Sequence, residues 1–490
     1  MLTAVSENAS KPTLIQKFRA RLAVPGVLDD LRSGLIGNDA EIEGPFGNKP
    51  LVYADYVASG RALMQIEEFI LREVLPFYAN SHTEASYCGG VVTRLRREAR
   101  KAIGDCCGAT DEHAVIFAGP GATAGLNRLV TLLGVNASGA AGKRARVIIG
   151  PYEHHSNILP WRESGAEIVE IAEGALGGPD LDELDAALRG VSEFDSVVCA
   201  FSAASNVTGI ITDVATVTRK AKAAGAKIVW DYAGAGPYLP IAMSPAEGVE
   251  IDAVVVSPHK FIGGPGASGV LIVRRDAVVT TKPCWPGGGT VKFVSPTVHD
   301  YSNSLEAREE AGTPNVVGDI RAALTFLVKD AIGQQNMQRR NDELVNRATA
   351  AWQGIDEIEL LGLPGAPKLP IFSFKVKDGR GGYVHQQLVT RMLSDRFGIQ
   401  ARGGCACAGP YVHRLLSIDA AESDLMRQDI LAGREIRKPG FTRLNFSVLL
   451  PDEKVEFILN SVIELARTAD RYSAMYDCDA SRAIFFPAAA

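Results

Sequence analysis

The sequence predicts an α/β protein with a large domain, built on a mostly parallel seven-stranded sheet, and a smaller α+β domain. Three observations lead to this fold class. Strand-like and helix-like segments alternate from about residue 110 to residue 273. The strand-like segments are nearly continuous runs of β-branched and other apolar residues, which is typical of parallel strands covered on both faces. A chain of 490 residues is also too long for one simple hydrophobic core.

The predicted elements follow one another along the chain. Strands of the large sheet are expected at 114–118, 146–149, 167–171, 196–201, 227–231, 253–256 and 270–273. Helices are expected before this sheet at 61–78 and 93–106, and after it as one long helix at 317–352, where apolar residues recur at helical spacing. The remaining segments are expected strands at 368–376, 399–402 and 440–449 and expected helices at 383–397 and 452–472.

These elements divide the chain into three parts. Residues 1–50 are expected to pack with the small domain. Residues 51–315 form the predicted large domain, and residues 316–490 form the predicted small domain, which starts with the long helix as a bridge. In an open α/β sheet, ligands bind outside the carboxyl ends of the strands. Several polar residues follow strands of the predicted sheet, so we expect the functional site there.

Composition narrows the class of partners. A net charge of −6 and a pI near 5.9 argue against a nucleic-acid partner. No run reaches roughly 18 apolar residues, so no membrane span is predicted. The eight cysteines show no spacing of a disulfide framework or a zinc site, and reduced thiols suit a cytoplasmic protein. Basic residues near the start leave an organelle-targeting segment as the alternative to an amphipathic first helix: Lys11, Lys17, Arg19 and Arg21.

A lysine between two buried strands is the central chemical feature. Lys260 follows the apolar run 251–256 and precedes a glycine-rich turn and a second apolar run, 269–273. Lysine is rarely buried without a partner, and desolvation lowers the pKa of its amine. A neutral amine is a nucleophile that forms a Schiff base with an aldehyde. The sequence therefore makes Lys260 a candidate for covalent attachment of a carbonyl compound.

A glycine-rich turn is a candidate phosphate site. Gly119 to Thr123 follow a predicted strand and open a helix. Free amide N–H groups at a helix start bind phosphate, helped by the helix dipole and a nearby hydroxyl. The turn lacks the Gly-Lys-Ser/Thr ending of a nucleotide P-loop, and ordinary turn chemistry is the alternative interpretation.

Two further strand ends carry groups that suit an aromatic cofactor. His154 and His155 follow the strand 146–149. Adjacent histidines point in different directions and make a poor metal pair, so either one imidazole lies against a ring or both lie at the surface. Asp231 ends a buried strand, where a carboxylate needs a cation or a donor. It either caps the next turn or pairs with a protonated ring nitrogen such as that of pyridoxal.

The predicted small domain supplies a thiol and a cation. Cys405 and Cys407 lie in the small-residue loop 402–409. They are candidates for a reactive nucleophile, for a metal-binding pair, or for two inert buried thiols. Arg443 lies at the start of a predicted strand and either clamps a carboxylate bidentately or forms an ordinary surface salt bridge.

Ten segments together resemble the fold-type I pyridoxal phosphate enzymes and, within them, the class V aminotransferases. The nearest resemblance is to the cysteine desulfurases and selenocysteine lyases, and it runs from about Tyr53 to the closing helix. The matching segments, in chain order, are ADYVASG, NSH, GATAGLN, EHHSNILPW, SNVTG, WDYAG, SPHK, EAGTPN, RGGCAC and TRLNF.

The resemblance implies pyridoxal 5′-phosphate as the cofactor and assigns residues to it. Lys260 is then the lysine that holds the cofactor through a Schiff base, His154 stacks on the pyridine ring, and Asp231 pairs with the ring nitrogen. The implied phosphate ligands are the amide of Ala122, the side chains of Thr123, Ser257 and His259, and Thr290 from a neighbouring subunit.

The resemblance also implies the substrate side of the site. Asn206 contacts cofactor and substrate, Arg443 clamps the substrate carboxylate, and Lys260 removes the Cα proton. The implied reaction is that of a C–S (or C–Se) lyase: Cys407 takes sulfur from L-cysteine or a close relative, which leaves a persulfide on the enzyme and releases alanine. A homodimer is expected because Thr290 acts only across a subunit boundary, and a sulfur-acceptor protein would be a further partner.

Departures from the family pattern keep other reactions open. Gly234 stands where the family usually has a glutamine that bonds the cofactor hydroxyl, and Asn445 stands in place of a usual serine. Cys405 and Ala406 stand where desulfurases often have histidine. The alternative is transamination, β-elimination from a cysteine derivative or epimerisation on the same scaffold. A third hypothesis is a non-catalytic sulfur-delivery or regulatory homologue.

Overall fold

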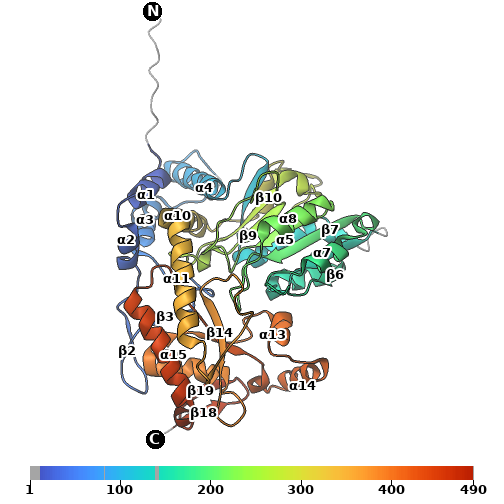
Figure 1. Cartoon of the computed structure of the whole chain (residues 1–490). Coiled ribbons are helices and arrows are strands. Elements are labelled where there is room, and N and C mark those ends of the chain that lie inside the picture. The colour runs from blue at the N-terminus through green and yellow to red at the C-terminus, as the bar shows by residue number, and fades with distance from the viewer. Residues whose placement is uncertain (1–11, 82, 138–142, 489–490) are drawn as a thin grey trace, which may run out of the picture.

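The computed structural model describes residues 12–81, 83–137 and 143–488. In this part of the chain the large sheet has seven strands in the order β4-β10-β9-β8-β7-β5-β6 (Figure 1). The strand β10 runs antiparallel to its neighbours β4 and β9, and the other pairs are parallel. The predicted α/β class is thereby confirmed. The strands are β4 His113–Gly119, β5 Ala145–Ile149, β6 Glu167–Glu170, β7 Ser196–Ser202, β8 Lys227–Asp231, β9 Ala253–Val256 and β10 Gly269–Arg274.

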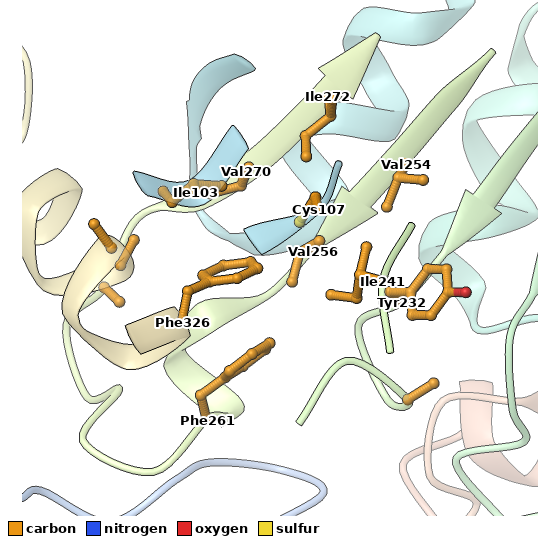
Figure 2. Close-up of a cluster of buried hydrophobic side chains, with 14 of the residues drawn as sticks. Ile103, Cys107, Tyr232, Ile241, Val254, Val256, Phe261, Val270, Ile272 and Phe326 are labelled. Atoms are coloured by element: carbon orange, nitrogen blue, oxygen red, sulfur yellow. The ribbon is translucent and has the colours of Figure 1, made fainter. Parts of the chain in front are cut away.

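Both faces of this sheet are buried, as its apolar strands require. Side chains alternate along a strand, so neighbouring residues pack on opposite faces. Val254 and Val256 of β9 lie in a core with Phe326 of α10 (Val316–Ile332), which packs beside α4 (Tyr87–Cys106) (Figure 2). Val255 lies in the opposite core with Leu129 of α5 (Gly121–Leu132). Helices therefore hold the sheet rigid from both sides.

A smaller, four-stranded sheet has a core of its own, and together with the helices that pack on it we call it the smaller layer. Its order is β13-β14-β17-β16, with every pair antiparallel, and its strands are β13 Ile358–Leu360, β14 Ile371–Val376, β16 Arg402–Gly404 and β17 Phe441–Asn445. Trp352 packs on Phe372 with ring centroids 5.2 Å apart, which anchors a helix on this sheet. The helices that share its core are α11 Gln334–Trp352, α12 Gln386–Phe397 and α15 Asp452–Ser473.

Several predicted elements differ from the structure: the helix expected at 93–106 begins at Tyr87, the strand expected at 399–402 is two strands of different sheets, and two helices and one strand differ further. The single helix over 317–352 is wrong, because Gly333 (φ 81°, ψ 140°) separates α10 from α11. The helix expected at 61–78 consists of α3 (Met64–Phe69), a π-helical turn and a 3-10 turn that contains Pro76. The strand β17 ends before 449 because its partner strand begins after Pro370, which has no N–H to donate to the ladder.

The N-terminal segment contacts both layers. Helix α1 (Leu14–Leu22) starts at a capping box and buries Phe18 in the core that contains α4 and α10. Further along, β2 (Lys49–Pro50) packs beside α12 of the smaller layer, and β3 (Val52–Tyr53) pairs with β15 (Ile399–Gln400). Residues 1–11, which carry the first of the basic residues considered for targeting, lie outside the described residues.

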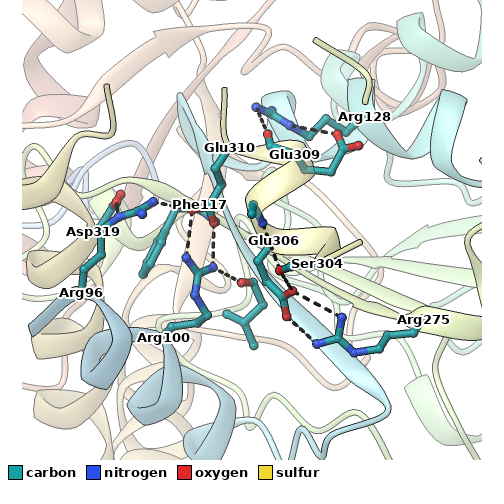
Figure 3. A network of polar contacts seen from close by, with 12 residues as sticks. Arg96, Arg100, Phe117, Arg128, Arg275, Ser304, Glu306, Glu309, Glu310 and Asp319 are labelled. Carbon is teal, nitrogen blue, oxygen red and sulfur yellow. Dashed lines mark hydrogen bonds and ion pairs between the residues drawn. The ribbon is translucent and has the colours of Figure 1, made fainter. Parts of the chain in front are cut away.

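A network of charged groups fixes the segment that leads into α10 (Figure 3). Glu310 accepts hydrogen bonds from Arg100 of α4 at 2.7 Å and from the N–H of Phe117 in β4 at 2.8 Å. Arg96 of α4 pairs with Glu310 and with Asp319 of α10, the latter at 2.6 Å. Buried charges are costly unless they are paired and hydrogen-bonded. The network meets this condition and ties α10 to the edge of the large sheet.

Candidate active site

A cavity of about 280 Å³ opens at the carboxyl ends of the large-sheet strands and is lined on its far side by residues of the smaller layer. With the exception of Thr290, each residue that the sequence assigned to the site lines this cavity. Those residues are Ala122, Thr123, His154, Asn206, Asp231, Ser257, His259, Lys260, Cys407 and Arg443. The fold therefore brings together groups that lie more than 300 residues apart.

The glycine-rich turn forms one end of the cavity. The N–H of Ala122 donates to Ser257 Oγ at 2.9 Å, and the hydroxyls of Thr123 and Ser156 lie 2.7 Å apart. Gly121 has φ 62°, and a Cβ there would lie 3.0 Å from Ser257 Oγ. Gly269, where β10 begins, approaches Gly121 so closely that a Cβ would lie 2.3 Å from its carbonyl oxygen. Only glycines allow the turn to leave an open, donor-lined pocket.

Lys260 and Asp231 form the centre of the cavity. Lys260 lies in a 3-10 turn directly after β9, and burial lowers the pKa of its amine to about 8, against the opposing effect of Asp231. Asp231 ends β8 and is buried. Burial raises the pKa of Asp231, whereas the hydrogen bond from the Ala233 N–H at 2.7 Å and the charge of Lys260 lower it. A nucleophilic amine and a carboxyl group thus share one pocket.

The two adjacent histidines have different surroundings. His154 lines the cavity, and burial lowers its pKa to about 4, helped by the charge of Lys260. Its Nδ1 accepts the N–H of Ser156 at 3.1 Å, which fixes the ring. His155 points elsewhere: its Nε2 accepts the N–H of Gly409 at 3.0 Å. A neutral imidazole with a fixed orientation can stack against an aromatic ring in the cavity, and Nε2 is then its protonated, donating nitrogen.

Arg443 lies on β17 of the smaller layer and lines the cavity, and its guanidinium donates two hydrogen bonds to other groups of the protein. Its Nη1 donates to the carbonyl of Asn206 at 2.9 Å, and its Nη2 donates to Asp55 at 3.0 Å. The second oxygen of Asp55 accepts from Arg402 Nε at 2.9 Å. Arg402 and Arg443 are direct partners across β16 and β17. A pair of arginines at one cavity wall provides positive charge for a carboxylate.

Three of these groups had no role in the sequence prediction. Asp55 lies in the ADYVASG segment and Arg402 lies in the RGGCAC segment, so both belong to matching segments. Their pairing depends on the β16–β17 register, which nothing local in the sequence specifies. For the His154–His155 pair, the sequence left open only whether one imidazole lies against a ring or both lie at the surface, and it gave His155 no partner. Its contact with Gly409 joins segments 254 residues apart in the chain.

The two cysteines of the loop are also distinguished by the structure. Cys407 is exposed and lines the cavity. Cys405 is partly buried and packs against the apolar cluster that contains Tyr411 and Phe441. Both residues are free thiols. Cys407 is therefore the thiol that can meet a molecule bound beside Lys260.

Thr290 lies apart from the cavity. It is buried, and its hydroxyl donates to the carbonyl of Gly287 at 2.7 Å. The hairpin that follows, β11 (Val291–Val294) with β12 (His299–Tyr301), carries apolar side chains at the surface, Phe293 among them. The assignment of Thr290 to a neighbouring subunit stays a prediction.

The donor set of the cavity fits pyridoxal phosphate. The pocket that a Cβ at Gly121 would fill is lined by hydroxyl, amide and imidazole groups suited to phosphate. Asp231 can pair with a ring nitrogen, and Lys260 can bind an aldehyde. Two buried polar atoms in the cavity wall, Asn206 Oδ1 and Arg443 Nε, have no hydrogen-bond partner among the described residues. Unsatisfied buried groups of this kind indicate a place for a ligand.

No group of three or more histidine, cysteine, aspartate or glutamate side chains in residues 12–81, 83–137 and 143–488 could hold a metal ion. Within the same residues, no helix combines the length and apolar character needed to cross a membrane.

Comparisons with known proteins agree with the fold and the cavity. The sequence model of the family described as Aminotransferase class-V matches residues 52–428. A cysteine desulfurase from Enterobacter sp. (strain 638) is 30% identical over 366 residues, which cover 74% of this chain and 85% of the relative. A probable cysteine desulfurase from Pyrococcus abyssi is 26% identical over 376 residues, 74% of this chain and 87% of the relative.

Among solved structures, the apo cysteine desulfurase from Thermococcus onnurineus NA1 superposes with a TM-score of 0.71. It is 25% identical in sequence and covers 90% of this chain and 98% of its own. A cysteine desulfurase from Escherichia coli, with a TM-score of 0.69 and 20% identity, supports the fold alone. The family match extends over more than three quarters of the chain. The chain therefore belongs to the class V aminotransferase family, whose members are pyridoxal-phosphate-dependent enzymes.

Proposed function

We propose that the protein is a pyridoxal-phosphate-dependent C–S (or C–Se) lyase that takes sulfur from L-cysteine and releases alanine. The observation that carries this proposal is the placement of the Cys407 thiol in the same cavity as Lys260 and Asp231. Relatives at 26–30% identity are named cysteine desulfurases. An amine, a ring-nitrogen partner and an accessible thiol in one pocket are the groups that such a reaction requires.

The proposed roles of the cofactor ligands are those that the resemblance to the family implies, and their common position on the cavity wall supports them. Ala122, Thr123, Ser257 and His259 hold the phosphate, Asp231 holds the ring nitrogen in its protonated form, and His154 lies against the ring. Bound pyridoxal phosphate supplies an electron sink for the bonds of the substrate Cα. All other steps belong to side chains of this protein.

Lys260 acts as the general base. With the substrate bound, the Lys260 amine would stand free beside the substrate Cα. Because burial and the nearby arginines lower the pKa of Lys260, a neutral amine is available to accept the Cα proton near neutral pH. Arg443, with Asn206 beside it, binds the substrate carboxylate and so fixes which bond at Cα faces Lys260.

Cys407 carries out the sulfur transfer. Its thiolate attacks the substrate sulfur, so that an S–S bond forms while the Cβ–S bond breaks, and the bond electrons move to the carbon skeleton. Cys407 becomes a persulfide and is the oxidised partner, and the carbon skeleton is reduced. Two protons, one at Cβ and one at Cα, complete alanine. The sulfur then passes to an acceptor, for which a sulfur-acceptor protein is the proposed partner.

A homodimer completes the proposed site. Thr290 lies outside the cavity of its own chain, next to a hairpin whose apolar side chains Phe293, Val294 and Val298 are more than half exposed. Exposed apolar groups on one hairpin favour burial against another surface. We propose that this surface belongs to a second copy and that Thr290 approaches the phosphate of that copy after dimerisation.

One observation favours a second candidate within the same family. Gly234 lines the cavity, and a Cβ there would make only ordinary contacts, with Asn206 Cβ at 3.5 Å and the Ala204 carbonyl oxygen at 3.9 Å. The cavity therefore has room where the family usually places a glutamine, which suits a bulkier cysteine derivative in a β-elimination, a transamination or an epimerisation.

The test is an incubation of the holoenzyme with L-cysteine and with other amino acids, followed by product identification by mass spectrometry. The proposal expects alanine, and sulfide when a reductant is present. Absence of both would refute it. The variant Cys407→Ala separates the candidates: loss of alanine formation supports sulfur transfer to Cys407, and full activity on the best substrate supports elimination, transamination or epimerisation.

A further inference from the structure

The loop that carries Cys407 has a conformation that needs outside support. It lies between β16 and α13 (Gly409–Leu415), and both Ala406 (φ 50°) and Cys407 (φ 55°) are left-handed. Residues with a Cβ rarely adopt this conformation, because the Cβ crowds the backbone, and it persists only where surrounding contacts impose it. Two such residues in succession therefore indicate that contacts from outside the loop stabilise its conformation.

The holding contacts come from the large sheet side of the cavity. Asn206 Nδ2 donates to the carbonyl of Ala406 at 2.8 Å. The backbone N–H of His155 donates to the carbonyl of Cys407 at 2.8 Å. The imidazole of His155 accepts the N–H of Gly409 at 3.0 Å. His155 thus makes two hydrogen bonds to this segment. One is to the carbonyl of Cys407, and the other is to the N–H of Gly409, two residues further along the chain.

The imidazole bond fixes the chemical state of His155. A backbone N–H can only donate, so Nε2 must be the unprotonated nitrogen and the ring must be neutral. Burial and the charge of Arg162 lower the pKa of His155, which agrees with a neutral ring. The neighbouring His154 has a different role, because its ring lines the cavity whereas His155 is absent from the cavity wall.

We propose that His155 is a positioning residue for Cys407: its imidazole acceptor holds the left-handed loop so that the thiol faces the cavity. The proposal rests on the proposed function, since it concerns the sulfur-accepting step. It assigns the two adjacent histidines to different halves of the reaction, with His154 at the cofactor and His155 at the thiol.

The region after the loop has separate anchors. The hydroxyl of Tyr411 donates to Glu173 at 3.1 Å, and Arg414 Nη2 donates to the carbonyl of Pro151 at 2.7 Å. Helix α13 therefore stays attached to the large layer without the imidazole. Loss of the His155 acceptor is expected to disturb residues 406–409 and to leave the fold and the cofactor pocket intact.

The experiment compares two substitutions in the holoenzyme. His155→Gln offers an amide oxygen near the position of Nε2 and can still accept the Gly409 N–H. His155→Phe fills the same space without an acceptor. If the Phe variant is insoluble, His155→Leu takes its place. Readouts are Cα proton exchange of L-alanine in D₂O, single-turnover persulfide formation on Cys407, and the alkylation rate of Cys407 by iodoacetamide, each of the last two resolved by peptide mass spectrometry.

A hydrogen bond of typical net strength corresponds to about a tenfold effect. The expected result is a roughly tenfold slower persulfide formation in the Phe variant, an altered alkylation rate, and Cα exchange close to that of the native enzyme. The Gln variant is expected to recover most of the persulfide rate. Because Cα exchange does not involve Cys407, it separates an effect on the loop from an effect on the cofactor.

Two results would overturn the inference. One is a Phe variant that forms persulfide as fast as the native enzyme. The other is equal loss of Cα exchange and persulfide formation in both variants, which would make His155 part of the cofactor pocket or of the general fold. Failure of the native enzyme to form alanine would refute the proposed function instead, and the alkylation rates of the two variants would still test whether His155 holds the loop.

Discussion

Asp55 holds Arg443 in place: its Oδ1 accepts Nη2 of the arginine at 3.0 Å, while its Oδ2 accepts Arg402 at 2.9 Å. These three charged side chains join the segment that contains Asp55 to the strands β16 and β17. Arg443 is buried, and burial lowers the pKa of its guanidinium, so the arginine depends on this carboxylate for compensation. The proposed clamp for a substrate carboxylate is therefore held in place by contacts within the protein itself.

The variant Asp55→Ala tests the clamp. A hydrogen bond to a charged group contributes about 1.5–3 kcal/mol, so we expect the KM for L-cysteine to rise roughly 10- to 100-fold and kcat to change less. Steady-state kinetics of alanine formation measure this split. Asp105→Ala is a control of equal charge change, because Asp105 pairs at the surface with Lys101. An unchanged KM in Asp55→Ala would mean that Arg443 needs no partner.

The glycine-rich turn predicts different effects for two neighbouring glycines. Gly119 (φ 92°) and Gly121 (φ 62°) are both left-handed, but a Cβ at Gly119 meets nothing within 4 Å. Alanine at either position should cost about 1–3 kcal/mol of stability through backbone strain. Gly121→Ala alone should also weaken pyridoxal phosphate binding, because its Cβ enters the pocket beside Ser257. Thermal unfolding and cofactor titration measure the two effects, and equal cofactor affinities would contradict the phosphate assignment.

The pKa of Lys260 predicts how cofactor binding depends on pH. The amine reacts in its neutral form, which dominates above the pKa of about 8. The rate of covalent reconstitution of the apoprotein should therefore be half-maximal near pH 8 and level off above it. Asp231 raises the pKa of Lys260, so Asp231→Asn should move the midpoint to lower pH. Stopped-flow absorbance measures the rate, with Lys260→Ala as the blank, and a midpoint that moves upward would contradict this electrostatic account.

The space at Gly234 gives a prediction about stability. The backbone there is not left-handed, and a Cβ would lie 3.5 Å from that of Asn206. Gly234→Ala should be neutral or stabilising by up to about 1 kcal/mol, since alanine reduces the entropy of the unfolded chain. Gly236→Ala is the matched contrast, because its Cβ would lie 2.6 Å from the carbonyl of Tyr232. Urea unfolding compares the two, and a destabilised Gly234→Ala would show that position 234 requires glycine.

Local patterns predicted much of the fold and the cavity. The strands of the large sheet are short apolar runs, and Lys260 and Asp231 follow or end such runs, so their place at the carboxyl edge follows from strand direction alone. The break at Gly333 was missed because apolar spacing continues across it, and a single glycine is compatible with a helix. The end of β17 depends on Pro370, which lies 75 residues earlier in the chain.

The remaining parts of the cavity depend on contacts between distant segments. The pairing of Asp55 with Arg402 and Arg443 requires the parallel docking of β3 beside β15 and the register of β16 on β17. The role of His155 appears only when its ring meets Gly409. No periodicity or spacing in the sequence specifies such register, so these residues became visible as partners only in the folded chain.

The most direct test of the central claim is a single turnover of the holoenzyme with one equivalent of L-cysteine. Alanine is quantified, and the peptide that contains Cys407 is analysed by mass spectrometry after rapid quenching and alkylation. The account predicts that alanine and a Cys407 persulfide form in equal amounts and at the same rate, with Cys405 unmodified. Alanine formed without sulfur on Cys407, or pyruvate and sulfide in place of alanine, would contradict it.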